Sequence, residues 1–190
     1  GRVDAARIVP LDSTPTRLLP DVRTRRFAAL SGALAASVDL GGGARVGASV
    51  ARGVRPPAVE ELFSAGPHLA TYAYEVGNPE LRAERGRGAD LFARVERPGL
   101  VVEASAFASW IDDFIHQAPL VDATTGLPER DPRLRRYPVY RATQARARLV
   151  GAEGRAQWEL PVAALPGLAL DATASWVRGT RLDADARGPL

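Results

Sequence analysis

The feature that most constrains the fold of this chain is a series of long segments in which apolar and polar residues alternate. The segment 26–40 is the clearest case. Its even-numbered residues from Ala28 to Leu40 are apolar or glycine, whereas Ser37 and Asp39 fall in the other register. A period of two places the two sets on opposite faces of a β-strand. The sequence therefore predicts an all-β protein.

About seven such strands follow one another as an antiparallel meander, at 2–9, 26–40, 44–53, 89–96, 100–110, 138–160 and 168–176. Their connections alternate between tight turns, at 41–43, 97–99 and 161–167, and long loops, at 52–84 and 117–136. This asymmetry is typical of outer-membrane β-barrels, which have short periplasmic turns and longer extracellular loops. In the longest strand the apolar residues change parity, which predicts a β-bulge near Val150–Gly151.

The lengths of the strands and the character of their two faces favour a membrane barrel over a soluble sheet. Strands of soluble sheets have about five or six residues, whereas a tilted strand needs about 9–11 to cross a bilayer. One face carries arginine and glutamate, which suits a water-filled lumen: Arg94, Glu96, Glu103, Arg146, Arg148, Glu153, Arg155 and Glu159. The other face is expected to contact lipid, with two tryptophans in aromatic girdles: Ala28, Leu30, Leu34, Val38, Val46, Val50, Leu91, Val95, Val102, Trp158 and Trp176.

Composition excludes several other classes. The formal net charge is +3 and the pI is near 9.9, but the basic residues are all arginine and are interleaved with acids along the chain. Nucleic-acid binding, which needs basic residues gathered on one face, is therefore not expected. There is no cysteine for a disulfide or a thiolate metal site, and no nucleophile elbow or phosphate-binding loop, so no enzyme activity is predicted.

The loop from 52 to 84 carries two motifs. The first is Arg55-x-Pro57-x-x-Glu60-Glu61-Leu62-Phe63, and the second is Gly77-Asn78-Pro79-Glu80-Leu81-Arg82-x-Glu84. In this order and spacing they resemble the stretches that flank one extracellular loop in the barrel domain of TonB-dependent outer-membrane receptors. The intervening segment from Gly66 to Thr71 is similar to the branch associated with uptake of zinc or other metals.

The resemblance implies that residues 1–190 are a partial barrel domain, about a third of a 22-stranded barrel, in the outer membrane of a Gram-negative bacterium. It implies uptake of scarce metal ions or metal chelates of the siderophore, haem or zinc type, with zinc or an iron chelate as cargo and not as a resident cofactor. Energy would come from the TonB–ExbB–ExbD complex, which acts on a plug domain and a TonB box that are expected to lie outside this piece. A passive porin-like barrel and a soluble β-sheet binding module are the alternatives.

Two histidines are the candidate contacts for a metal at the mouth. His68 lies in the first long loop with Glu60, Glu61 and Glu75, whereas His116 follows Asp112 and Asp113 at the end of a strand. Zinc requires three or four such ligands to converge. The structural alternative is that Glu60 and Glu61 fix the loop by pairing with Arg52 or Arg55, and that the two aspartates face solvent.

Overall fold

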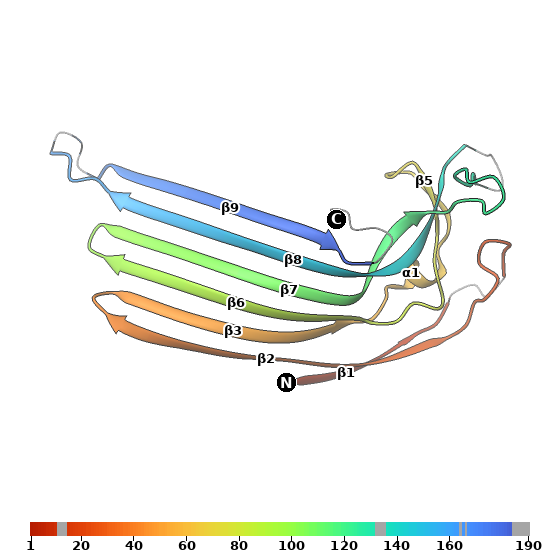
Figure 1. Cartoon of the computed structure of the whole chain (residues 1–190), viewed down its shortest axis with the longest axis horizontal. Helices are drawn as coiled ribbons and strands as arrows, with labels where there is room; N and C mark the ends of the chain where they lie inside the picture. The colour runs from red at the N-terminus through yellow and green to blue at the C-terminus, as the bar shows by residue number, and fades with distance from the viewer. Residues whose placement is uncertain (11–14, 132–135, 164, 166, 184–190) are drawn as a thin grey trace.

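The computed structural model describes residues 1–10, 15–131, 136–163, 165 and 167–183, and one sheet of nine strands dominates it (Figure 1). A single short helix, α1 (Val59–Phe63), is present in this described part. The strands are β1 (Arg2–Ile8), β2 (Arg25–Gly41), β3 (Ala44–Arg55), β4 (Ala65–His68), β5 (Ala73–Val76), β6 (Glu84–Arg97), β7 (Leu100–Pro119), β8 (Val139–Glu159) and β9 (Ala169–Arg181).

Seven of these strands form the wall that alternation predicts. They lie in the order β1, β2, β3, β6, β7, β8 and β9, and every neighbouring pair is antiparallel. Among the described residues β1 pairs only with β2, and β9 pairs only with β8, so the wall is open and has two free edges. The predicted meander is therefore confirmed.

The two ends of the wall differ as expected. The tight turns lie together at the left of Figure 1, and we call this the turn end; α1, β5 and the long connections lie at the right, the loop end. The predicted turn at 161–167 and loop at 117–136 include residues 164, 166 and 132–135, which lie outside the described residues. In the described part of the chain no helix is long and apolar enough to cross a membrane.

The first long loop contains structure that alternation did not predict. β4 and β5 form a small hairpin, and β5 pairs in parallel with the first residues of β8, Tyr74 opposite Val139. The loop therefore leaves the wall at β3 and is hydrogen-bonded to β8 before it returns to the neighbouring strand β6. Strands of four residues are too short for a period of two to identify them.

The predicted bulge near Val150–Gly151 is wrong. β8 pairs with β7 and β9 without interruption through those residues. The irregularity lies in β7, where Ile111 pairs with Ala147 and the next pair is Phe114 with Ala145. Two residues of β7, Asp112 and Asp113, are thus accommodated opposite one residue of β8.

The prediction failed because the residue types on one face of β8 change along the strand, whereas the backbone register does not. Ala147 and Leu149 lie on the same face as Glu153, because the pairing with β7 is regular from Ala147 onward. Ala145 and Ala147 are only 5% and 1% exposed, so near the loop end this face is covered and apolar instead of wet. Consequently Arg146 and Arg148, both expected on the polar face, lie on the opposite one.

Two faces follow from the register. The apolar face contains the predicted set, since Leu34 pairs with Val50, Val95 with Val102, and Ala152 with Trp176. Most of the large side chains in this predicted set are exposed, from Val102 at 38% to Leu34 at 74%. The polar face contains Arg94, Glu103 and Arg155. No second protein layer covers the described part of the apolar face along the straight section of the wall.

Candidate functional site

The candidate site is the first long loop, at the loop end of the wall, and a pair of apolar clusters anchors it. One cluster joins Leu62 of α1 to Leu81, Ile115 of β7 and Ala142 of β8. The other joins Tyr74 and Val76 of β5 to Val139 of β8 and to Leu18. Because Leu62, Val76 and Val139 are fully buried, these contacts hold α1, β5 and the return of the loop at Leu81 against the wall.

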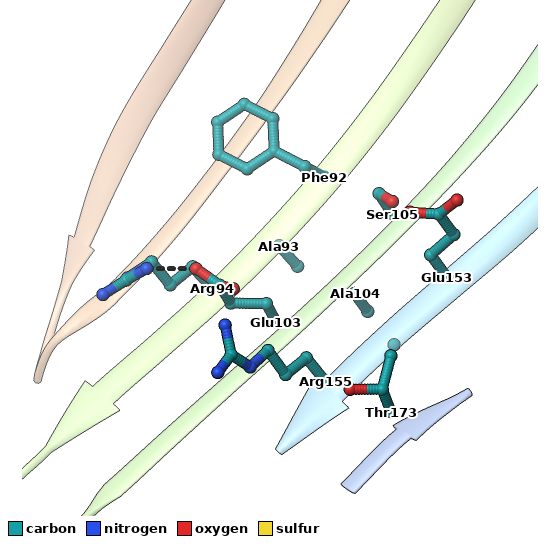
Figure 2. Close-up of a pocket in the computed structure, with 10 residues that line it drawn as sticks. Phe92, Ala93, Arg94, Glu103, Ala104, Ser105, Glu153, Arg155 and Thr173 are labelled. Atoms are coloured by element: carbon teal, nitrogen blue, oxygen red, sulfur yellow. Dashed lines mark hydrogen bonds and ion pairs between the residues drawn. The ribbon is translucent and has the colours of Figure 1, made fainter. Parts of the chain in front are cut away.

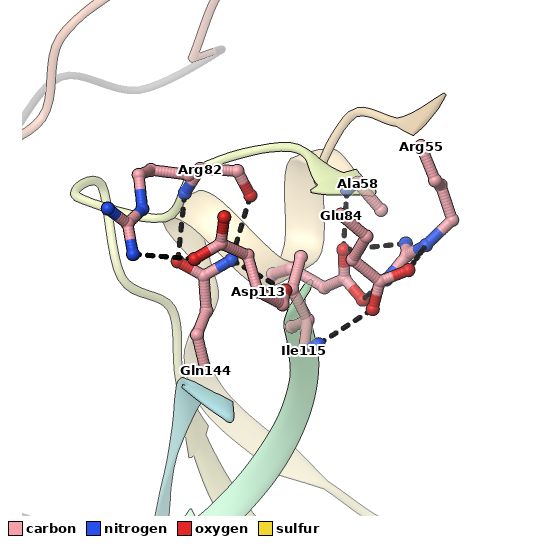
Figure 3. Close-up of polar contacts among 8 residues, drawn as sticks. Arg55, Ala58, Arg82, Glu84, Asp113, Ile115 and Gln144 are labelled. Carbon is pink, nitrogen blue, oxygen red and sulfur yellow. Dashed lines mark hydrogen bonds and ion pairs between the residues drawn. The ribbon is translucent and has the colours of Figure 1, made fainter. Parts of the chain in front are cut away.

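Arg55 is the centre of the first polar network (Figure 3). Its guanidinium donates to both carboxylate oxygens of Glu61, at 2.9 and 3.1 Å, and to Glu84 at 2.6 Å. Glu61 also accepts the backbone N–H of Ala58 at 2.7 Å, which satisfies a free donor at the start of α1. The other oxygen of Glu84 accepts the N–H of Ile115 at 2.6 Å. This network joins β3, α1, β6 and β7.

The second motif forms the turn that returns the chain to β6. Gly77 donates its N–H to Ser64, and Asn78 donates its own to the carbonyl of Glu61. The side chain of Asn78 accepts the N–H of Glu80 at 2.9 Å, which is an Asx turn. A Cβ on Gly77 would lie 2.4 Å from the carbonyl carbon of Leu62, so only glycine fits against α1 there. The two motifs thus bind each other.

A second polar network surrounds Asp113, which is 7% exposed and has a φ of 60°. Aspartate is one of the few residues that adopt this left-handed region readily. Its carboxylate accepts Arg82 at 2.5 Å and Arg85 at 2.8 Å. The side-chain amide of Gln144 bonds both the N–H and the carbonyl of Arg82 and also donates to the carbonyl of Asp113 (Figure 3). This network fixes the bulge of β7 to the return of the loop.

His68 and Glu75 are brought together across the β4–β5 hairpin. Nδ1 of His68 lies 3.0 Å from Oε1 of Glu75 and 3.2 Å from the hydroxyl of Thr71, which in turn donates to the same carboxylate at 3.1 Å. A carboxylate can only accept, so the proton of the neutral imidazole belongs on Nδ1. Nε2 then carries the free lone pair, and it makes no hydrogen bond within the described part of the chain.

The other candidates do not join this pair. Glu61 is occupied by Arg55, Asp113 by two arginines, and Asp112 by Arg87 at 2.9 Å. Glu60 is exposed on α1. His116 stacks on Phe114, and its buried Nδ1 has no hydrogen-bond partner within the described part of the chain. Among the described residues no three of His, Cys, Asp and Glu form a group that could hold a metal ion.

The polar face toward the turn end is charged but internally neutralised. Arg94 is bound by Glu96 at 2.8 Å and by Glu103, and Arg155 is bound by Asp171 at 2.8 Å. Arg94, Glu103, Glu153 and Arg155 line a shallow hollow of about 410 Å³ together with Phe92, and Figure 2 shows these side chains on neighbouring strands. The lining of the hollow carries two positive and two negative side chains, so its charge is balanced.

The second long connection contains a carboxylate that accepts two backbone hydrogen bonds. Asp122 accepts the N–H groups of Thr125 and Thr124 at 2.9 and 2.8 Å, and these bonds lower the pKa of its carboxyl below the ordinary value. A lowered pKa in the folded state means that the turn is stabilised at neutral pH. That contribution is lost as the pH falls through the lowered pKa.

The chain is similar to proteins of known family and structure. A family model described as "TonB dependent receptor-like, beta-barrel" matches residues 1–189. The solved structure of the copper transporter OprC is 21% identical, with a TM-score of 0.72, and the match covers 99% of this chain and 26% of that one. The siderophore receptor PirA from Pseudomonas aeruginosa is 20% identical, with a TM-score of 0.55, and the match covers 84% of this chain and 31% of that one.

At these identities the two structures establish a shared fold. The chain spans about a quarter to a third of the length of either protein. A search of the curated proteins found no match.

Proposed function

Since the chain belongs to the TonB dependent receptor-like β-barrel family, we propose that it forms part of the wall and mouth of an active transporter in the outer membrane of a Gram-negative bacterium. The observation that carries this proposal is the open sheet with one uncharged, exposed face along the straight section of every long strand. Lipid would cover that face, and further strands of the barrel would pair with the free edges of β1 and β9. The role is transport and not catalysis.

The ordered loop supports a receptor over a passive pore. Two buried clusters and two polar networks hold the segment from Val59 to Glu84 against the wall. A loop fixed in this way presents its polar groups with little loss of entropy on binding. A soluble binding module, the other alternative, would have to leave the apolar face exposed to water, which is a liability for a soluble sheet.

For the cargo, we propose a metal held in a chelate with one open coordination position, bound by Nε2 of His68. Glu75 would act as the orienting partner of the imidazole and not as a ligand, which is the usual arrangement for a metal-binding histidine. One imidazole is too few for a bare zinc ion, which takes three or four protein ligands. A metal that already has most of its ligands needs only one more.

Uptake by the full-length receptor tests the transport proposal. A strain that lacks its own receptor for a metal chelate should regain growth on that chelate when it produces the protein, and only when TonB is present. Growth that is independent of TonB would favour the passive pore.

Binding of metal chelates tests the role of His68. We expect His68→Ala to abolish the change in the absorption spectrum of the bound chelate, and Glu75→Gln to weaken binding while leaving the spectrum of the complex intact. Glu60→Gln, on the exposed side of α1, is the matched control and should bind as the wild type does. If His68→Ala binds normally, the cargo is held by other groups of the mouth.

A further inference from the structure

The apolar face ends in arginine on nearly every strand of the wall. Along this face the first charged residue beyond the apolar band, toward the loop end, is an arginine in six of the seven strands. These loop-end arginines are Arg7, Arg26, Arg52, Arg87, Arg148 and Arg178. In β7 the corresponding position is Trp110, which pairs with Arg87 on one side and Arg148 on the other. At the turn end the same face carries Arg97.

The loop-end arginines lack the partners that arginines of the other face have. On the polar face Arg45, Arg94 and Arg155 are each bound by a carboxylate. Among the loop-end arginines only Arg87 is so bound, by Asp112. The other five are exposed and make no side-chain hydrogen bond or ion pair within the described part of the chain.

Their register makes this lack of partners unfavourable. Arg52 is directly opposite Arg87 across β3 and β6, and Arg7 is directly opposite Arg26 across β1 and β2. Like charges at directly opposed positions repel, since their Cβ atoms are about 5 Å apart. An anion placed between the two guanidinium groups would turn this repulsion into attraction, and a phosphate can accept two donors from each guanidinium.

We propose that the loop-end arginines bind the phosphate groups of lipid head groups in the outer leaflet of the membrane. This rests on the proposed membrane location. The adjoining apolar band would contact the acyl chains of the same lipid, so one lipid molecule would contact both the arginines and the apolar band. Arginine is tolerated on the lipid side of a barrel near the interface, where its stem covers apolar surface and its head reaches the phosphates. Because these arginines are more numerous at the loop end than at the turn end, the proposed lipid site lies in one leaflet.

The test is lipid binding by the full-length receptor in a neutral detergent, with Arg52→Gln compared to Arg97→Gln. Arg97 is exposed on the same face without an ion pair, but at the turn end. The probes are lipid A, dephosphorylated lipid A and inorganic phosphate. We expect the wild type to bind lipid A in a salt-dependent manner, and dephosphorylated lipid A far more weakly. Arg52→Gln should weaken binding roughly fivefold, as expected for one basic residue at an anionic surface, and Arg97→Gln should leave it unchanged.

A variant with Arg52, Arg148 and Arg178 all changed to glutamine should lose nearly all of the preference for phosphorylated lipid. Heat-modifiable migration in detergent gels shows that each variant is folded. Equal binding of dephosphorylated lipid, wild-type binding by the triple variant, or equal competition by inorganic phosphate would each overturn the inference. A protein that inserts into bilayers and supports TonB-dependent uptake without this preference refutes the lipid site alone. Failure to insert refutes the proposed function as well.

Discussion

At the scale of single residues, the two sequence motifs of the loop have a structural explanation that does not involve cargo. Arg55, Glu61 and Glu84 bind one another, and Asn78 closes the turn that carries the chain back to β6. The family resemblance grouped these residues into two motifs, and pairing of Glu61 with Arg55 was one of the two interpretations that the sequence allowed. The alternation of apolar and polar residues did not predict the network of Arg82, Asp113 and Gln144, because its contacts join residues 31 to 62 positions apart.

Gly77 provides a prediction at this scale. In Gly77→Ala the new Cβ would overlap the backbone of Leu62 and Phe63, and overpacking of this kind costs about 1–3 kcal/mol. We expect faster proteolysis of the loop in the full-length receptor. Gly66→Ala in the same loop is the control, since nothing lies within 4 Å of its Cβ position. Equal proteolysis of the two variants would show that Gly77 does not need its close approach to α1.

Asp113 provides a second prediction at the scale of single residues. Asp113→Asn keeps the shape of the bulge but removes the charge that Arg82 and Arg85 share. Hydrogen bonds to a charged group are worth about 1.5–3 kcal/mol, so the free energy of unfolding should fall by about this amount and the urea midpoint of the barrel should fall with it. Asp112→Asn, at a more exposed neighbour with one ion pair, should change it little. A larger effect at Asp112 than at Asp113 would contradict this assignment.

At the scale of elements, the sequence predicted the long wall strands, which share one repeating pattern, and missed the short elements of the first loop, which do not. The seven wall strands were found because a period of two persists for many residues, and their register confirms the meander. α1, β4 and β5 have four or five residues each and are fixed by tertiary contacts. The bulge was misplaced because a covered stretch of the polar face, at Ala145 and Ala147, looks the same in sequence as the apolar face.

The two faces of β2 differ in a way that substitution can measure. Leu34→Arg would place a charge in the middle of the apolar band, where the cost for a barrel in a bilayer is about 2–4 kcal/mol. Ala33→Arg, the adjacent position on the polar face, should be nearly neutral. Unfolding of the reconstituted full-length receptor in urea measures both, and equal destabilisation by the two substitutions would contradict the assignment of the faces.

At the scale of the whole molecule, the central claim is that this open sheet is a section of a barrel wall with lipid on one face and water on the other. Three features agree with it: uncharged apolar bands, neutralised pairs on the polar face, and free edges at β1 and β9. The same arrangement explains why the long connections gather at one end, where α1 and β5 of the first long loop lie (Figure 1).

The most direct test is the accessibility of nitroxide labels at successive positions 34 to 38 of β2 in the full-length receptor, reconstituted in bilayers. Labels at Leu34, Ala36 and Val38 should collide with oxygen dissolved in the lipid, and labels at Ala35 and Ser37 with a water-soluble nickel chelate. A period of two between the two reagents is the predicted result. Equal access of the nickel chelate to all five positions would contradict the account.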